Sequence, residues 1–242
     1  MNQDSGIPSP ILSLRNVGAF YWRRSGYLRK EHFWALKDVS FDLYQGESLG
    51  IIGRNGAGKS TLLKLLAGII SPDKGKLINY GFTTTLLSLQ LGFLPNLSGR
   101  ENAILSGMLL GMKRKEIEKR LSYIQEFSEL DDFFDQPINT YSSGMRARLG
   151  FSVAFQLDPD VLLIDEILGV GDADFRKKSE AVMREKIRSD KTIVLVSHSA
   201  ATVRQLCNRT VWIENGETKA EGETAEVLRS YEGSLGSQSI KK

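Results

Sequence analysis

A glycine-rich segment between an apolar run and a leucine-rich helical pattern constrains the fold of this chain most strongly. The segment is Gly53-Arg54-Asn55-Gly56-Ala57-Gly58-Lys59-Ser60, followed by Thr61. Glycines at this spacing let successive backbone N–H groups point into one concavity, and the start of the next helix strengthens this anion site. Lys59 adds a cation for phosphates, and Ser60 adds a hydroxyl for Mg²⁺. The segment therefore predicts a phosphate-binding loop whose residues are the first candidate nucleotide ligands.

The strand patterns define the fold class. Residues 49–52, 161–164 and 193–196 are apolar almost throughout, which is typical of parallel strands covered by helices on both faces. Residues 11–17 and 35–44 look like half-buried antiparallel strands. We therefore predict an α/β fold with a mainly parallel core sheet and an antiparallel β-subdomain.

Helical patterns dominate the middle of the chain. Between about residues 86 and 157, positions such as Ile117, Leu121, Ile124 and Phe127 follow a helical period, and no clear buried strand interrupts them. We expect a helical subdomain there, inserted into a single domain that spans residues 1–242. Near the end, Asn215-Gly216 predicts a hairpin turn. The Gly- and Ser-rich tail at about 233–242 is expected to be flexible.

Two carboxylates and one imidazole follow the apolar runs. Asp165 and Glu166 end the run at 161–164, and His198 follows the run at 193–196. The carboxyl ends of parallel strands share one edge of the sheet, where ligands gather. Asp165 is a candidate Mg²⁺ ligand, Glu166 a candidate general base for an attacking water, and His198 a candidate contact to the γ-phosphate.

Composition excludes several classes of protein. The 32 Lys and Arg against 29 Asp and Glu give a net charge of only +3, too small an excess to indicate nucleic-acid binding. The single Cys207 cannot form an internal disulfide, which favours a reducing, cytosolic compartment. No apolar run approaches the roughly 20 residues that cross a bilayer, so we expect any membrane-spanning segment to belong to another chain.

Together with the phosphate loop, the segment Tyr141-Ser142-Ser143-Gly144-Met145 resembles the signature motif of the ABC ATPase family, usually Leu-Ser-Gly-Gly-Gln. The resemblance covers nearly the whole chain and implies ATP and Mg²⁺ as cofactors. It implies that Ser142 to Met145 bind the γ-phosphate of ATP held by a second copy of the chain. Ser143 and Met145 depart from the usual Gly and Gln.

Three further positions match that family by spacing. Asp172, seven residues after Asp165, corresponds to the aspartate of its D-loop. Gln90 corresponds to the glutamine that coordinates Mg²⁺ and senses the transmembrane partner. Tyr21 corresponds to the aromatic residue that stacks on adenine, with Phe20, Trp22 and Trp34 as alternatives.

Within the family, the chain resembles the ATPase subunits of bacterial polysaccharide exporters. The shared features are Tyr141 to Leu149, Ile167 to Ala173, Leu97-Ser98-Gly99-Arg100-Glu101-Asn102 and an aromatic, basic insert from Tyr21 to Trp34. The resemblance implies export of a lipid-linked polysaccharide, with O-antigen as the first expectation and capsule or teichoic acid as alternatives. It also implies two copies each of this chain and of a polytopic partner, with this chain at the cytoplasmic face of the bacterial inner membrane.

Other functions remain open at this stage. A DNA-repair ABC ATPase is disfavoured because about eighty residues between Ser60 and Ser142 leave no room for a long coiled coil. Ribosomal ABC proteins usually carry two such domains. A non-hydrolysing regulatory protein is disfavoured by Glu166 and His198. Within the insert, Arg23, Arg24, Arg29 and Lys30 suggest contact with anionic lipid head groups or a pyrophosphate-linked substrate.

Overall fold

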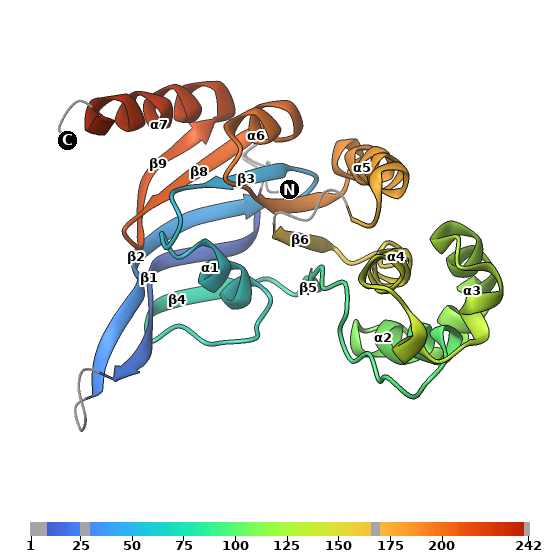
Figure 1. Ribbon diagram of the computed structural model, residues 1–242. Coiled ribbons are helices and arrows are strands. Elements are labelled where there is room, and N and C mark those ends of the chain that lie inside the picture. The colour runs from blue at the N-terminus through green and yellow to red at the C-terminus, as the bar shows by residue number, and fades with distance from the viewer. Residues whose placement is uncertain (1–8, 25–29, 166–169, 240–242) are drawn as a thin grey trace, which may run out of the picture. The chain divides into compact units, whose positions relative to one another are not determined.

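The computed structural model describes residues 9–24, 30–165 and 170–239, and these divide into two compact units (Figure 1). The first unit comprises residues 1–86, 160–166 and 187–242, and the second comprises residues 87–159 and 167–186. The second unit contains the helical segment expected between 86 and 157. It also contains most of a helix after residue 167 that the sequence analysis did not assign to it.

The first unit is built on one sheet. Among the described residues, nine strands follow the order β4-β1-β2-β9-β8-β3-β7-β6-β5. Their bounds are β1 Pro10–Arg24, β2 Lys30–Tyr44, β3 Ser48–Ile52, β4 Lys74–Asn79, β5 Thr84–Leu86, β6 Val161–Asp165, β7 Thr192–Val196, β8 Arg209–Glu214 and β9 Glu217–Glu223. The strands from β8 to β5 pair in parallel, whereas β1 pairs antiparallel with both β2 and β4. The predicted α/β class with a mainly parallel core is therefore confirmed.

Helices pack against the parallel part of this sheet. In β3, Leu49 and Ile51 belong to the same apolar core as the leucines of α1 (Lys59–Leu66). Gly50 lies between them, and its lack of a side chain lets Val203 of α6 (Ala200–Leu206) approach the strand closely. The apolar runs are therefore continuous because alternate residues are buried under helices, as predicted for parallel strands.

The predicted turn at Asn215-Gly216 joins β8 to β9 and also holds other segments. Both residues have positive φ, 52° and 81°, as a two-residue hairpin turn of type I′ requires. The carbonyl of Gly216 accepts hydrogen bonds from Lys37 N at 2.7 Å and Asp38 N at 3.2 Å, and its N–H donates to Ala57 O at 3.2 Å. The turn therefore links β2 to the phosphate loop.

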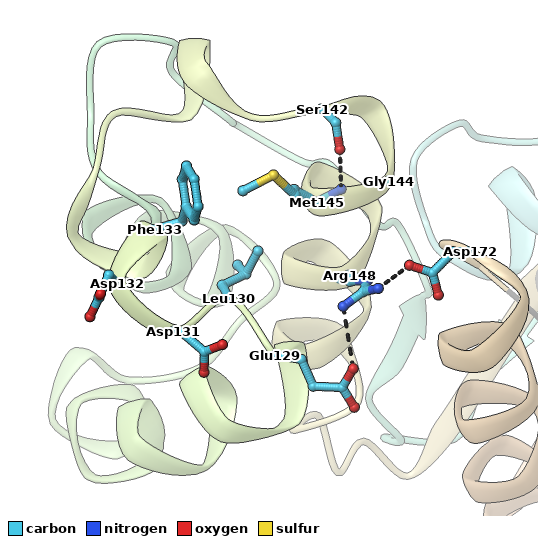
Figure 2. Close-up of a pocket in the computed structure, with 10 residues that line it drawn as sticks. All are labelled: Glu129, Leu130, Asp131, Asp132, Phe133, Ser142, Gly144, Met145, Arg148 and Asp172. Atoms are coloured by element: carbon cyan, nitrogen blue, oxygen red, sulfur yellow. Dashed lines mark hydrogen bonds and ion pairs between the residues drawn. The ribbon is translucent and has the colours of Figure 1, made fainter.

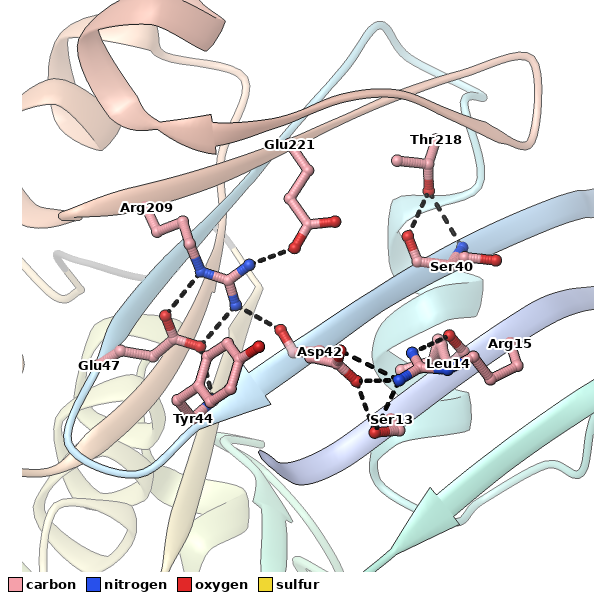
Figure 3. A network of polar contacts seen from close by, with 10 residues as sticks. All are labelled: Ser13, Leu14, Arg15, Ser40, Asp42, Tyr44, Glu47, Arg209, Thr218 and Glu221. Carbon is pink, nitrogen blue, oxygen red and sulfur yellow. Dashed lines mark hydrogen bonds and ion pairs between the residues drawn. The ribbon is translucent and has the colours of Figure 1, made fainter. Parts of the chain in front are cut away.

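Arg209 of β8 connects the antiparallel and the parallel strands of the sheet through several hydrogen bonds (Figure 3). It donates to both carboxylate oxygens of Glu47, at 2.7 and 2.8 Å, and also contacts Glu221 and the carbonyl of Asp42. Burial opposes the charge of Arg209, but the hydrogen bonds and attraction of Glu47 raise its pKa. Burial also opposes the charge of Glu221. Because Glu221 is an acid, burial raises its pKa, despite the ion pair with Arg209.

Two elements of this unit extend further than the sequence patterns indicated. Residues 20–24 and 30–34 of the insert continue β1 and β2 beyond the expected strands at 11–17 and 35–44, and they pair with each other in one register. The tail is helical up to the end of α7 (Thr224–Ser239). Val227, Leu228 and Tyr231 are buried along one side of α7, and this packing anchors a helix whose last residues are weak helix formers.

The second unit is helical. It contains α2 (Gly99–Leu109), α3 (Arg114–Ser128), α4 (Ser143–Ala154), most of α5 (Ala173–Arg188) and two short 3₁₀ helices, η1 (Asp131–Asp135) and η2 (Ile138–Thr140). The predicted helical period at Ile117, Leu121, Ile124 and Phe127 is confirmed, since all four side chains are buried. Phe127 contacts the rings of three other phenylalanines at 5.7 to 6.1 Å, and these are Phe151, Phe155 and Phe175.

Candidate nucleotide-binding site

The phosphate loop runs from the end of β3 into α1. Gly56 and Gly58 have φ of 78° and 104°, a region that L side chains rarely adopt. A Cβ at Gly58 would also collide with the carbonyl of Ala35, and a Cβ at Gly53 would collide with the carbonyl of Ile213. The neighbouring strands therefore leave room only for glycine at both positions.

Lys59 lies inside this loop. Its ammonium group donates to the carbonyl oxygens of Gly53 at 2.8 Å and Arg54 at 3.0 Å, and the residue is 8% exposed. Gly58 caps α1 without a side-chain hydrogen bond, so the first N–H groups of the helix remain suited to an anion. A buried cation and these N–H groups together fit a polyphosphate.

A cavity of about 540 Å³ opens over the loop. One part of its wall is polar and the other aromatic, and Tyr21 Oη lies 3.4 Å from Thr61 Oγ1. The lining residues are Tyr21, Phe33, Ala35, Asn55, Gly56, Gly58, Lys59, Ser60, Thr61 and Asp165. Phosphate-binding groups beside aromatic rings suit a nucleoside triphosphate.

Asp165, the candidate metal ligand, lines this cavity at the end of β6, where it is paired in register with Val196 of β7. His198 is exposed and lies two residues beyond the end of β7, at the carboxyl edge of the same sheet. Glu166, the predicted base, lies outside the described residues. Asp165 and Ser60 are therefore the predicted metal ligands that share the cavity with Lys59.

The aromatic wall differs from the sequence expectation in one residue. Tyr21 lines the cavity as expected, but its neighbour is Phe33, its partner in the β1–β2 register. The alternatives Phe20, Trp22 and Trp34 do not line the cavity and contact one another or His32 instead. Phe33 was not among the predicted residues, because alternation along β2 becomes informative only once the register with β1 is known.

The signature segment begins a helix of the second unit. Ser142 caps α4, and its hydroxyl accepts from the N–H of Met145 at 3.1 Å. Ser142 and Ser143 are exposed, whereas Gly144 and Met145 are partly buried. The N-terminus of α4 is therefore accessible in this unit.

Asp172 lies beside Arg148 of α4, in the wall of a second cavity of about 490 Å³ that Ser142 also lines (Figure 2). Its carboxylate accepts from Phe175 N at 3.1 Å and forms an ion pair with Arg148 of α4. The Phe175 N–H, and then Arg148, hold the pKa of Asp172 below its usual value. Arg148 also contacts Glu129 at 3.3 Å and lies over the Phe175 ring at 5.3 Å.

The second cavity brings Ser142 and Asp172 into one wall, with Arg148 between their segments. Arg148 was not predicted from the sequence, because its partner Asp172 is 24 residues away along the chain. Gln90 is exposed in a turn of the second unit, whereas Ser60 and Asp165 belong to the first unit. Its role as a metal ligand stays a prediction.

The residues of the first cavity fit Mg²⁺ only together with a nucleotide. Within the described ranges, no three His, Cys, Asp or Glu side chains form a group that could hold a metal. Ser60 and Asp165 would supply two oxygen ligands and phosphate oxygens would supply more, which is how Mg²⁺ is usually bound beside nucleotides. Across all the residues that the structure describes, no helix combines the length and apolar character needed to cross a bilayer.

Comparison with known proteins agrees with this geometry. Residues 36–169 match the ABC transporter family model. An O-antigen export system ATP-binding protein, RfbB of Klebsiella pneumoniae, is 47% identical over 204 residues, which cover 84% of this chain and 83% of that protein. A teichoic acids export ATP-binding protein, TagH of Enterococcus faecalis, is 48% identical over 82% of this chain and 44% of its own length.

Solved structures show the same fold. A dimeric ATP-binding cassette in a post-hydrolysis state with ADP and Pi bound is 24% identical, with a TM-score of 0.68 over 88% of this chain and 98% of that chain. The ATP-binding subunit of an ABC transporter is 25% identical, with a TM-score of 0.69 over 91% of this chain and 93% of its own. The chain described here is therefore an ATPase cassette that belongs to the ABC transporter family.

Proposed function

We propose that this chain is the ATP-hydrolysing subunit of a transporter that exports a lipid-linked polysaccharide, O-antigen in particular. The observation that carries the proposal is the identity of 46 to 49% to O-antigen export ATP-binding proteins of Klebsiella pneumoniae and Myxococcus xanthus. Teichoic acid is the second candidate substrate, because teichoic acid export proteins are 44 to 48% identical.

ATP binding is proposed to use the groups of the first cavity. Lys59, already held over the loop by two carbonyl oxygens, would exchange these contacts for the β- and γ-phosphates. Ser60 and Asp165 would hold Mg²⁺, which neutralises phosphate charge when bound. Tyr21 and Phe33 would contact the adenine ring.

Hydrolysis is proposed to use two further groups at the carboxyl edge of the sheet. Glu166 would orient or deprotonate the attacking water, and His198 would contact the γ-phosphate. A Glu166→Gln variant should bind ATP but hydrolyse it very slowly. Near-normal turnover in this variant would remove Glu166 from its role as base.

The complete site is proposed to form between two copies of the chain. The exposed N-terminus of α4, with Ser142 to Met145, and the Asp172 loop would meet the nucleotide bound by the partner's phosphate loop. ATP binding would bring the two copies together, and hydrolysis would separate them. Gln90 would contact the metal and pass the motion to the transmembrane partner.

The cassette is proposed to work at the cytoplasmic face of the bacterial inner membrane, with two copies of a polytopic partner. The complex would therefore be reconstituted in proteoliposomes, and its ATPase rate measured with lipid-linked O-antigen and with lipid-linked teichoic acid. We expect O-antigen to stimulate hydrolysis more strongly than teichoic acid. The reverse result would identify the second candidate, and stimulation by neither glycan would reject both candidate substrates. Failure to copurify with any polytopic protein would instead favour a non-transport ATPase.

A further inference from the structure

The outer ends of β1 and β2 form a two-stranded extension, defined here as residues 20–24 and 30–34 (Figure 1). The register of β1 with β4 ends at Gly18 and Lys74, and β2 pairs with β9 only at Asp38 and Glu217. Beyond Ala19, the described residues of the two strands therefore pair only with each other. Such a hairpin has two faces, and no other strand of the described sheet covers its edges.

The two faces of the hairpin extension differ in what they contact. Tyr21 and Phe33 lie on the face that lines the nucleotide cavity. On the opposite face, defined here as the aromatic face, Phe20, Trp22, His32 and Trp34 form a ring cluster. The closest pair, Phe20 and His32, is stacked at 4.2 Å, and Trp22 meets His32 edge-on at 4.3 Å.

Cross-strand packing alone accounts for only part of this cluster. Aromatic pairs stabilise isolated hairpins, and such a role would be served by buried rings. Instead, Trp22 is 63% exposed and Trp34 is 37% exposed. Two of the three tryptophans of the chain thus lie on one protruding surface, where their rings remain available to a partner.

The stretch of sequence that contains this extension is basic. Residues 21–34 contain four basic residues and one acid, a net charge of +3, which equals the net charge of the whole chain. The rest of the sequence is therefore neutral overall. Arg23 and Arg24 are both exposed, and Arg24 follows Trp22 on the aromatic face.

We propose that the aromatic face, with Arg24 on it and the exposed Arg23 next to it in sequence, binds the interfacial region of an anionic lipid bilayer. Tryptophan rings favour the level of lipid head groups, where an apolar body and a polar N–H are both accommodated. Each basic residue near an anionic surface strengthens binding by about fivefold. Two exposed tryptophans and two exposed arginines on a two-stranded extension therefore match one partner, a negatively charged membrane surface. This match does not depend on which polysaccharide is exported.

The proposal can be tested by vesicle flotation with the full chain and without nucleotide. Vesicles of phosphatidylcholine alone are compared with vesicles that also contain phosphatidylglycerol. We expect the chain to float with the anionic vesicles only, and added salt to release it. Arg24→Gln should weaken this binding by about fivefold, and Trp22→Ala should weaken it to a similar or greater extent.

Matched controls carry the same chemical changes on other surfaces. Lys119→Gln removes one exposed positive charge from α3, and Tyr80→Ala removes an aromatic residue that is 54% exposed; both should leave flotation unchanged. Nucleotide binding by each variant serves as the check of folding, and Trp22→Phe replaces Trp22→Ala if the latter fails this check.

Three results would overturn the proposal: no flotation of the wild-type chain, equal flotation with neutral vesicles, or equal losses in the hairpin and control variants. Hairpin variants that float normally but no longer copurify with a membrane protein would make the extension a protein-docking element instead. Because this assay needs no ATP hydrolysis, its failure leaves the proposed transport function untouched.

Discussion

Arg148 holds Asp172 by an ion pair and, with its other amino group, contacts Glu129 at 3.3 Å (Figure 2). The side chain of Arg148 is only 19% exposed, and Lys178 holds Glu129 from another direction at 2.7 Å. Arg148 follows Ser142 on α4, so it fixes the Asp172 loop relative to the helix end that is proposed to meet the partner's nucleotide.

An Arg148→Gln variant should therefore lower kcat for ATP hydrolysis by about tenfold, because the Asp172 loop loses its anchor on α4. Asp172→Asn should cause a similar loss, and the double variant should be little worse than either single one. Steady-state ATPase assays of the four proteins measure this coupling. Arg114→Gln, whose ion pair with Glu118 is exposed, is the control. Fully additive losses would show that the two residues act separately.

Phe33→Ala should weaken ATP binding by about tenfold, as should Tyr21→Ala, because a base stacked on an aromatic ring gains about 1–3 kcal/mol. Tyr21→Phe should retain most of the affinity. Trp22→Ala, on the other face of the same hairpin, is the matched control and should bind ATP normally. Titration with a fluorescent ATP analogue compares the four variants. Normal affinity in Phe33→Ala would exclude this residue from the adenine site.

Glu221→Gln should stabilise the chain relative to wild type by an amount that grows with pH. Burial raises the pKa of Glu221 in the folded protein, so the folded state favours the protonated form. This contribution to stability is complete below the unfolded pKa and is lost as pH rises through the folded pKa. Urea unfolding of both proteins at acidic and neutral pH measures the difference. If the difference in unfolding free energy between the variant and wild type became smaller toward neutral pH, the predicted direction would be wrong. Glu217→Gln, which removes one partner of an exposed ion pair with Lys219, is the control variant.

Cys207 should resist alkylation in the native protein. Burial raises the pKa of its thiol to about 12, so the reactive thiolate is scarce at neutral pH. Iodoacetamide at pH 8 should leave the folded chain unmodified and label it fully in urea, as measured by mass spectrometry. Because the sequence has one cysteine, the mass change is unambiguous. Rapid labelling without denaturant would show that the segment around Cys207 opens readily.

The sequence predicted those features that depend on short segments. The phosphate loop, the apolar parallel strands and the helical period around Ile117 each follow from local spacing, and the structure contains all of them. The same holds for the Asn215-Gly216 turn, because only a few residue types tolerate its two positive φ angles.

Features that depend on distant residues were not predicted. Phe33 lines the cavity because of the register between β1 and β2, and Arg148 pairs with a residue 24 positions away. The helix α7 is held on the sheet by Tyr231, which packs edge-on against Trp212 of β8 at 5.6 Å. Local propensity carries no information on these contacts.

The hydrogen bond from Gly216 to Ala57 has a consequence for the order in which the chain matures. Every residue of the phosphate loop leaves the ribosome long before the β8–β9 turn that supports its backbone. A nascent chain whose Gly216 is still inside the ribosome should therefore contain the complete phosphate-loop sequence, but the loop backbone should not yet have its native conformation. Domains are synthesised from the N-terminus at about 5–20 residues per second. Affinity for nucleotide should therefore develop late in synthesis, so that only a cassette whose β8 and β9 have joined the sheet binds ATP.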